Sequence, residues 1–221
     1  MTPHAILFDL DGTLADTALD LGGALNRLLA EEGRPPVADE LVRPVASHGA
    51  RGLVELGFQM KRDEPGFDAL RLRFLDHYEH CFNERTVLFD DINTLVEAIA
   101  ARGLAWGIIT NKPMRFTDRL VPTLGFTVKP GVVVSGDTVG VPKPDPRPMH
   151  YACERLGVDP AHCWYVGDAE RDIAAGRAVG MTTVLADYGY IADTDHPEQW
   201  GADHRINAPL ELLALLPTHR V

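Results

Sequence analysis

The chain has 221 residues, 45% hydrophobic and 24% charged, and its 21 basic and 32 acidic residues give a formal net charge of −11. This composition is ordinary for a soluble globular protein, and the length allows one α/β domain that carries an inserted lobe. The acidic balance disfavours nucleic acid and anionic membrane surfaces as partners, so a small anionic ligand would need a local metal or basic group.

The three cysteines, Cys81, Cys153 and Cys163, are odd in number and far apart, which predicts neither a disulfide framework nor a paired-cysteine zinc motif. The first residues show no pattern of a signal peptide, and no run approaches the ~20 apolar residues of a membrane span. We therefore expect a cytoplasmic protein without membrane contact. Both a monomer and a homodimer are compatible with the sequence.

The run from Ala5 to Phe8 is short and wholly apolar, which predicts a buried parallel strand. Asp9 and Asp11 follow it two residues apart, and the alternation of side chains in a strand would place both on one side. Two carboxylates about 4 Å apart repel by roughly 4 kcal/mol at an effective dielectric of about 20, which favours a cation between them. Gly12 then permits a tight turn.

Helical periodicity dominates the next part of the chain. Leucines at helical spacing predict a helix over residues 17–32, and residues 37–83 show no strand-like alternation. We expect three further helical segments there, the first around residues 39–45 with Asp39 as its cap, and two more at residues 52–60 and 67–82. This stretch is interpreted as a separate helical lobe.

From residue 91 onward, amphipathic helices alternate with short apolar strands. The expected helices cover residues 92–99, 115–124, 148–156, 172–179 and 210–216, and the expected strands cover residues 104–109, 132–134, 163–166, 182–185 and 203–206. Such alternation predicts an α/β fold with a Rossmann-like, doubly wound parallel sheet that is covered by helices on both faces.

Polar side chains follow several of these strands. Ligands of open parallel sheets bind beyond the carboxyl ends of the strands, so these residues are expected to share one site. The aspartates offer the hard oxygen ligands that Mg²⁺ prefers, and Thr110 and Lys143 offer donors for a phosphoryl group. The candidate residues are Asp9, Asp11, Thr110, Asn111, Lys112, Lys143, Gly167, Asp168 and Asp172.

Four motifs occur in order along nearly the whole chain: Asp9-Leu10-Asp11-Gly12-Thr13, Thr110-Asn111, Lys143-Pro144-Asp145, and Gly167-Asp168 to Asp172. With this order and spacing, the sequence resembles the haloacid dehalogenase superfamily of phosphatases. The resemblance implies a Mg²⁺-dependent phosphomonoester hydrolase that acts on a small phosphorylated metabolite through an aspartyl-phosphate intermediate.

The same resemblance implies a role for each motif residue. Asp9 would be the nucleophile, and Asp11 would act as general acid and then as general base. Asp9, the main-chain carbonyl of Asp11 and Asp168 would hold Mg²⁺, with Asp172 behind them, either directly or through water. The residues expected to bind the phosphate are Gly12, Thr110, Asn111 and Lys143.

The chain between Asp9 and Thr110 is much longer than the gaps between the later motifs. In this superfamily such a gap implies a helical cap, here residues 18–89, inserted into a core made of residues 1–17 and 90–221. Within the cap, residues 47–51 are the best candidate to contact the leaving group, through His48 and Arg51. The Arg51 guanidinium could bind a substrate carboxylate in a bidentate manner.

The sequence resembles two subgroups of this superfamily that act on different substrates. The core motifs and the cap size are similar to those of phosphoglycolate phosphatases, although Asp90-Asp91 stands where many of these carry Pro-Gly. Three segments also resemble N-acetylmuramic acid 6-phosphate phosphatases, namely residues 111–116, 188–191 and 200–203. A phosphosugar mutase and a non-catalytic phosphate-binding protein are the alternatives, whereas Asp11 argues against a dehalogenase.

Overall fold

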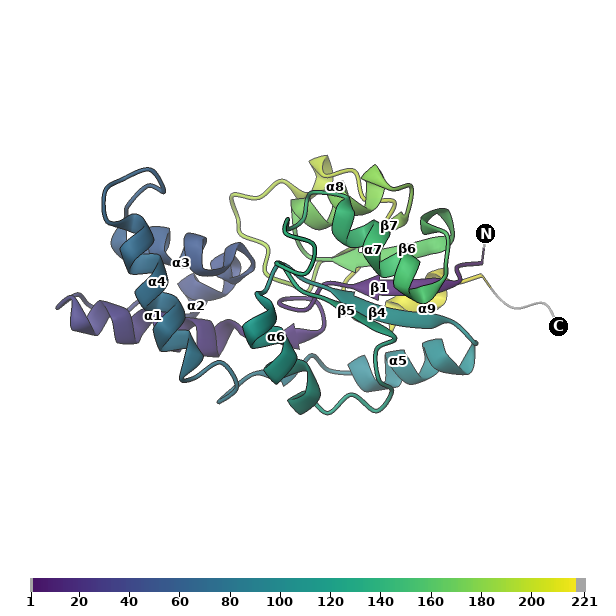
Figure 1. Ribbon diagram of the computed structural model, residues 1–221, viewed down its shortest axis with the longest axis horizontal. Helices are drawn as coiled ribbons and strands as arrows, with labels where there is room; N and C mark the ends of the chain where they lie inside the picture. The colour runs from purple at the N-terminus through teal and green to yellow at the C-terminus, as the bar shows by residue number, and fades with distance from the viewer. Residues whose placement is uncertain (1, 218–221) are drawn as a thin grey trace.

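The computed structural model describes residues 2–217 (Figure 1). Six strands form one sheet in the order β5-β4-β1-β6-β7-β8, and every neighbouring pair is parallel. The expected doubly wound α/β fold is therefore confirmed. The strands are β1 (Ala5–Phe8), β4 (Ala105–Ile109), β5 (Val132–Val134), β6 (Cys163–Gly167), β7 (Thr182–Ala186) and β8 (His204–Ile206).

The central strand β1 has apolar residues on both faces because both faces of the sheet are covered. Ile6 and Phe8 belong to the cluster that contains side chains of α5 (Ile92–Ala101), α6 (Met114–Leu120) and α9 (Glu211–Leu215). Ala5 and Leu7 belong to the opposite cluster, with α7 (Arg147–Leu156) and α8 (Glu170–Ala178). Figure 1 shows α7 and α8 on one side of the sheet and α5 and α9 on the other.

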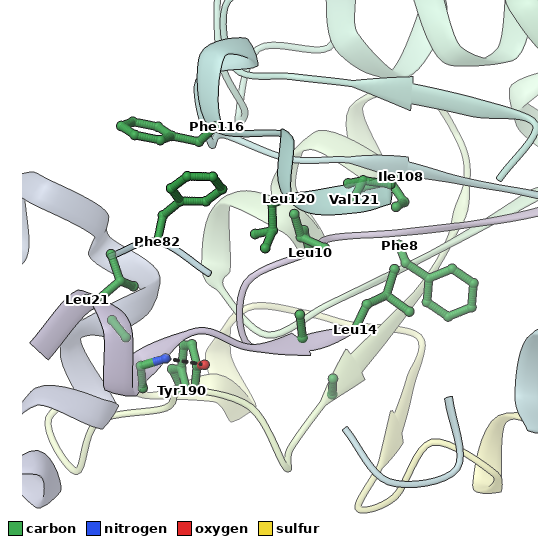
Figure 2. Packing of buried hydrophobic residues seen from close by; sticks show 14 of the residues in the cluster. Phe8, Leu10, Leu14, Leu21, Phe82, Ile108, Phe116, Leu120, Val121 and Tyr190 are labelled. Carbon is green, nitrogen blue, oxygen red and sulfur yellow. Dashed lines mark hydrogen bonds between the residues drawn. The ribbon is translucent and has the colours of Figure 1, made fainter. Parts of the chain in front are cut away.

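A group of helices lies beyond the edge at which the strands of the sheet end (Figure 1). Within it, α1 contacts both α3 and α4, and α3 contacts α4. Aromatic residues connect this group to the core, since the Tyr78 and Phe116 rings lie 5.0 Å apart and the Phe82 and Phe116 rings lie 6.0 Å apart. Figure 2 shows Phe82 beside Phe116. The elements are α1 (Ala18–Glu31), α2 (Asp39–Val42), the 3-10 helix η1 (Arg43–His48), α3 (Gly49–Phe58) and α4 (Phe67–Glu79).

Two short antiparallel strands, β2 (Ala15–Asp16) and β3 (Val87–Leu88), pair where the chain leaves the sheet and returns to it. The sequence analysis missed them because two residues are too few to show a period. The Tyr190 hydroxyl stabilises the chain beside this strand pair. It accepts a hydrogen bond from the Thr17 N–H at 2.7 Å and donates one to Asp16 Oδ1 at 2.7 Å.

Some element boundaries differ from the expectation. The helix expected to reach residue 124 ends at Leu120 and continues as the 3-10 helix η2 (Val121–Thr123), because Pro122 lacks an N–H and cannot continue an α-helix. Asp39 is the first residue of α2 rather than its cap. The remaining 3-10 helices are η3 (Pro160–His162) and η4 (Pro197–Gln199). Among residues 2–217, no helix combines the length and apolar character that crossing a membrane requires.

Candidate active site

The carboxyl ends of three adjacent strands bring the motif residues together. Asp9 follows β1, Thr110 follows β4 and Asp168 follows β6. Because β1 lies between β4 and β6 and all three run in parallel, these residues share one edge of the sheet. Lys143 joins them from the loop between β5 and α7, and all four side chains are buried.

The Lys143 ammonium lies at the centre of this group. Its Nζ is 3.0 Å from Asp9 Oδ1 and 2.7 Å from Asp172 Oδ1. It also donates hydrogen bonds of 2.7 Å to the Ile109 carbonyl and to the Tyr165 hydroxyl. A buried ammonium is stable only with such partners, so the position of Lys143 is fixed from several sides.

Asp9, Asp168 and Asp172 form a buried acidic cluster in which each residue offers a carboxylate oxygen within 4.8 Å of the others. Burial and the two neighbouring carboxylates raise the pKa of Asp168 to about 7. Burial also raises the pKa of Asp9 to about 6, although Lys143 acts in the opposite direction. Buried carboxylates that resist ionisation would be stabilised by a cation, and their oxygen donors suit a hard ion. The residues therefore fit Mg²⁺.

Asp168 is held by three donors from separate parts of the chain. The Thr13 hydroxyl donates to Oδ1 at 3.1 Å, while the Ser47 hydroxyl and the Tyr190 N–H donate to Oδ2 at 2.6 and 2.9 Å. Gly12, with φ +84°, lies directly beside it, since a Cβ at this position would be 2.2 Å from Asp168 Oδ2. Gly12 thus supplies both the turn conformation and the space for Asp168.

Asp9 and Asp11 follow the end of β1 at Phe8 and line the same pocket, but they contact different lysines. Asp11 Oδ1 lies 2.8 Å from the Lys112 Nζ, whereas Asp9 contacts Lys143. Each carboxylate therefore has its own lysine, and the acidic cluster forms between Asp9 and the residues after β6.

The two residues of the second motif, Thr110 and Asn111, make different contacts. The Thr110 hydroxyl oxygen accepts a hydrogen bond from the Lys112 N–H at 3.1 Å, and within residues 2–217 no acceptor takes its proton. It can therefore donate into the pocket. The Asn111 side chain instead accepts from the Lys143 N–H at 2.8 Å and donates to the Lys143 carbonyl at 2.9 Å. Asn111 was expected to bind phosphate, and its amide here holds the Lys143 loop.

These groups open into a pocket of about 610 Å³ between the sheet edge and the helices α1, η1, α3 and α4. His48 and Arg51 both line it, as expected for the two candidate substrate contacts, and Arg51 is exposed. Burial and the nearby Arg171 lower the pKa of His48. The basic residues that line the pocket are Arg51, Arg62, Arg71, Lys112, Lys143 and Arg171.

Lys112 was predicted to lie at this site without a stated role, and Tyr78 and Arg171 were not predicted as site residues. Lys112 is buried and pairs with Asp11, and the Tyr78 hydroxyl accepts a hydrogen bond from its Nζ at 2.8 Å. Arg171 donates to the Ser47 carbonyl at 2.7 Å. Arg171 lies inside the fourth motif and Lys112 directly follows the second, so their positions in the sequence could have indicated a role, whereas Tyr78 has only the pattern of a core aromatic residue.

Comparisons with known proteins agree with this geometry. The family model described as "Haloacid dehalogenase-like hydrolase" matches residues 6–186. A relative from Pseudomonas putida named N-acetylmuramic acid 6-phosphate phosphatase is 43% identical over 212 residues, which cover 96% of this chain and 95% of the relative. A protein of the same name from Pseudomonas aeruginosa is 44% identical over 220 residues, which cover 98% and 96%.

Further relatives carry another name. A phosphoglycolate phosphatase from Xanthomonas campestris pv. campestris is 40% identical over 210 residues, covering 95% of each chain. Among solved structures, a predicted phosphoglycolate phosphatase from Haemophilus somnus 129pt superposes with a TM-score of 0.84 at 25% identity, covering 97% of this chain and 98% of that one. The two names found among the relatives are the two subgroups that the sequence resembles.

Proposed function

Taking as premise that the chain belongs to the haloacid dehalogenase-like hydrolase family and is a phosphatase, we propose that it hydrolyses phosphomonoesters of small metabolites through a phosphorylated Asp9. The observation that carries this proposal is the position of Asp9 on the pocket floor, 3.0 Å from the Lys143 Nζ. A carboxylate held beside an ammonium at the base of a pocket is suited to attack an electrophile that carries negative charge.

In the first step, Asp9 would attack phosphorus and displace the alcohol oxygen. Asp9 Oδ1 accepts a hydrogen bond from the Leu10 N–H at 2.7 Å and faces Lys143. Asp9 Oδ2 receives no hydrogen bond from the part of the chain that the structure describes, so this oxygen can act as the nucleophile. The hydrolysis is thereby split into two displacements at phosphorus, in which Asp9 is first the nucleophile and then the leaving group, and each has a lower barrier than direct hydrolysis.

The charge of the phosphoryl group requires positive partners. Lys143 and the Thr110 hydroxyl would contact its oxygens, and the backbone of the turn at Gly12 would add N–H donors. Asp9, Asp168 and the main-chain carbonyl of Asp11 would hold Mg²⁺, which supplies positive charge against the repulsion between nucleophile and phosphate. The contacts of Asp172 with Lys143 and with the Ala169 N–H support a place behind these ligands.

Asp11 would transfer the protons. It would protonate the oxygen of the leaving alcohol and then take a proton from the water that attacks the phosphorylated Asp9. Both carboxylates line the same pocket, and the Asp11 side chain is 17% exposed there, whereas that of Asp9 is buried. This difference matches a nucleophile below the substrate and a proton carrier at the pocket wall.

We also propose that residues 18–89 act as a cap over a core formed by residues 1–17 and 90–221. The short pair β2 and β3 lies at both crossings between these parts, which supports a hinge there. A cytoplasmic location is proposed because Cys81, Cys153 and Cys163 are free thiols, as in a reducing compartment.

The substrate proposed is a phosphate ester that also carries a carboxylate. Both named candidates, 2-phosphoglycolate and N-acetylmuramic acid 6-phosphate, have this group, and Arg51 on the cap side of the pocket could bind it. The pocket of about 610 Å³ favours the larger ester, since pockets of about 300–1,000 Å³ enclose drug-sized ligands. A two-carbon acid would leave much of this space to water.

A phosphate-release assay with Mg²⁺ tests the proposal. The panel contains N-acetylmuramic acid 6-phosphate, 2-phosphoglycolate and N-acetylglucosamine 6-phosphate, which is the matched control because it differs from the muramic ester only in lacking the 3-O-lactyl group that carries the carboxylate. We expect kcat/KM for the muramic ester to exceed that for the control by about 10-fold or more. Absence of phosphate release from every ester would contradict the proposal, and isomerisation of a sugar phosphate without release would indicate a mutase.

A further inference from the structure

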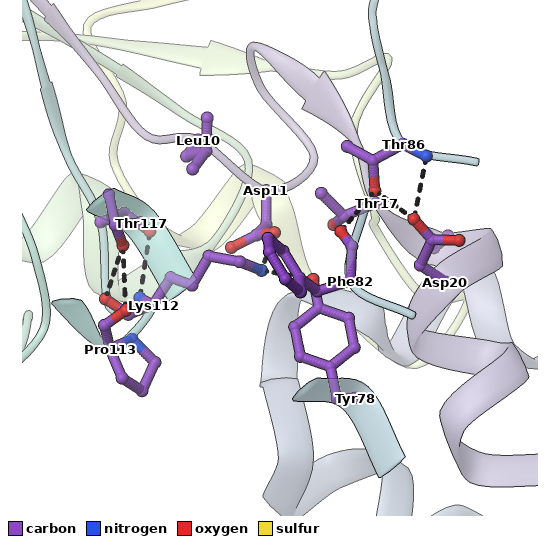
Figure 3. A network of polar contacts seen from close by, with 12 residues as sticks. Leu10, Asp11, Thr17, Asp20, Tyr78, Phe82, Thr86, Lys112, Pro113 and Thr117 are labelled. Atoms are coloured by element: carbon purple, nitrogen blue, oxygen red, sulfur yellow. Dashed lines mark hydrogen bonds and ion pairs between the residues drawn. The ribbon is translucent and has the colours of Figure 1, made fainter. Parts of the chain in front are cut away.

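Among the residues that the structure describes, Lys112 is the one buried lysine that the proposed mechanism does not use. Its side chain is 5% exposed, and its Nζ lies 2.8 Å from Asp11 Oδ1 (Figure 3). The same ammonium donates a hydrogen bond of 2.8 Å to the Tyr78 hydroxyl. A buried lysine with two such contacts is fixed in place rather than free to follow a ligand.

The contact with Lys112 leaves the two oxygens of Asp11 in different surroundings. Oδ1 faces the ammonium, whereas within residues 2–217 no hydrogen bond reaches Oδ2. An ammonium has no acceptor, so a proton on Asp11 must reside on Oδ2 while Oδ1 accepts from Lys112. Because the side chain lines the pocket, Oδ2 is the oxygen that can meet a substrate.

Tyr78 links this arrangement to the helical segment. It lies on α4, its ring is buried, and it packs edge-on against Phe116 of α6 at 5.0 Å and against Phe82 at 6.3 Å. Lys112 and Asp11 are 101 positions apart in the chain. The three groups can therefore meet only when α4 is seated on the core.

We propose that Lys112 is a positioning residue that fixes the proton of Asp11 on the oxygen facing the pocket, and that Tyr78 makes this arrangement depend on the seating of α4. The proposal rests on the proposed phosphatase function. When the alcohol leaves, the proton moves from Asp11 Oδ2 to the ester oxygen as the P–O bond breaks. Lys112 keeps its three protons throughout and contacts neither phosphorus nor the leaving group.

The test compares two substrates that differ in their need for that proton. The alkoxide of N-acetylmuramic acid 6-phosphate must be protonated as it leaves, whereas p-nitrophenolate leaves without a proton. The value of kcat/KM reports the first displacement for both. For Lys112→Met, we expect kcat/KM to fall by about 100-fold with the alkyl ester and by less than about 5-fold with p-nitrophenyl phosphate, as expected when general acid catalysis is lost.

Two further variants make the comparison specific. Tyr78→Phe keeps the ring and removes the hydroxyl, so we expect a smaller loss, about 5-fold, that is again confined to the alkyl ester. Lys129→Met removes the same charge from an exposed position and should leave both kinetic values unchanged. If Lys112→Met does not fold, Lys112→Gln takes its place with the same expected difference between the substrates.

The outcomes separate this inference from the proposed function. An equal loss of kcat/KM with both substrates, in a variant with wild-type thermal stability, would overturn the role of Lys112 and leave the phosphatase intact. An unchanged kcat/KM with the alkyl ester would overturn it as well. A wild-type protein that releases no phosphate from either ester would instead refute the proposed function.

Discussion

The two sides of the pocket differ in how their side chains are held. The floor is formed by the residues that follow the strands, and the opposite side is formed by the proposed cap, residues 18–89. On the floor, groups from distant parts of the chain contact one another, as in the pairs Asp9 with Lys143 and Asp11 with Lys112. On the cap side, the arginines are paired within their own segments or face the pocket. Arg62 pairs with Glu55 at 2.8 Å, and its side chain is 55% exposed.

This difference indicates how reaction and specificity are divided. Replacing a floor side chain removes a contact from a buried charged partner, so the floor tolerates little change. An exposed arginine on the cap contributes little to stability and can be exchanged at low cost. We therefore expect substitutions on the floor to lower kcat/KM for all phosphate esters. Substitutions on the cap side should change it only for esters that contact the cap.

The largest effect is expected for Asp9→Asn. The amide is a poor nucleophile and cannot form the phosphorylated intermediate, so kcat should fall by about 10⁴-fold or more with every substrate. Thermal unfolding should show that the variant still folds, because Lys143 keeps Asp172 as a partner at 2.7 Å. Appreciable turnover of any ester by the folded variant would exclude Asp9 as the nucleophile.

A smaller but still general loss is expected for Gly12→Ala. The added Cβ would lie 2.2 Å from Asp168 Oδ2, and φ +84° is strained for alanine, so Asp168 must shift. We expect kcat/KM to fall by about 100-fold for all esters, as for a displaced catalytic group. Gly33→Ala is the control, because it has a similar φ of +65° with no atom within 4 Å. Equal activity losses in both variants would show that strain, rather than Asp168, is responsible.

The acidic cluster should also be visible in the stability of the metal-free protein. The pKa of Asp168 is raised from 3.8 to about 7, so the folded state binds the extra proton between these values. The free energy of unfolding should therefore fall as pH rises through this interval, by an amount on the order of 4 kcal/mol over the whole interval, and Asp168→Asn should remove this contribution.

Urea unfolding in EDTA at about pH 5 and about pH 7.5 measures this effect in wild type and Asp168→Asn. Addition of Mg²⁺ should restore the stability of the wild type at the higher pH and have little effect on the variant, because ligand binding stabilises only the protein that retains the site. A pH dependence that is identical in both proteins would count against a buried, protonated Asp168.

The smallest and most selective effect is expected on the cap. Arg51→Ala should raise KM for the carboxylate-bearing substrate by about 10-fold, because the carboxylate loses one charged hydrogen-bonding partner. The KM for p-nitrophenyl phosphate should stay unchanged. Arg155→Ala, an exposed arginine on α7, is the matched control. A loss with both substrates would place Arg51 in phosphate binding instead, which would break the division between floor and cap.

The long and the short strands differ in how well they could be predicted from the sequence. The apolar run of β1 and the polar residues after β1, β4 and β6 predicted the sheet and the edge at which the site lies, because burial on both faces leaves a local pattern. The same approach failed for β2 and β3, which are too short for a pattern.

The sequence by itself determined the α/β fold, the order of the motifs and the set of candidate residues, because short-range periodicity and strand ends are encoded locally. Only the tertiary structure decided which of those residues meet. It grouped Asp9 with Asp168 and Asp172, gave Asp11 to Lys112, and turned the Asn111 amide toward the Lys143 backbone. These pairings join positions far apart in the chain, and their geometry follows from how the helices and strands pack rather than from any local pattern.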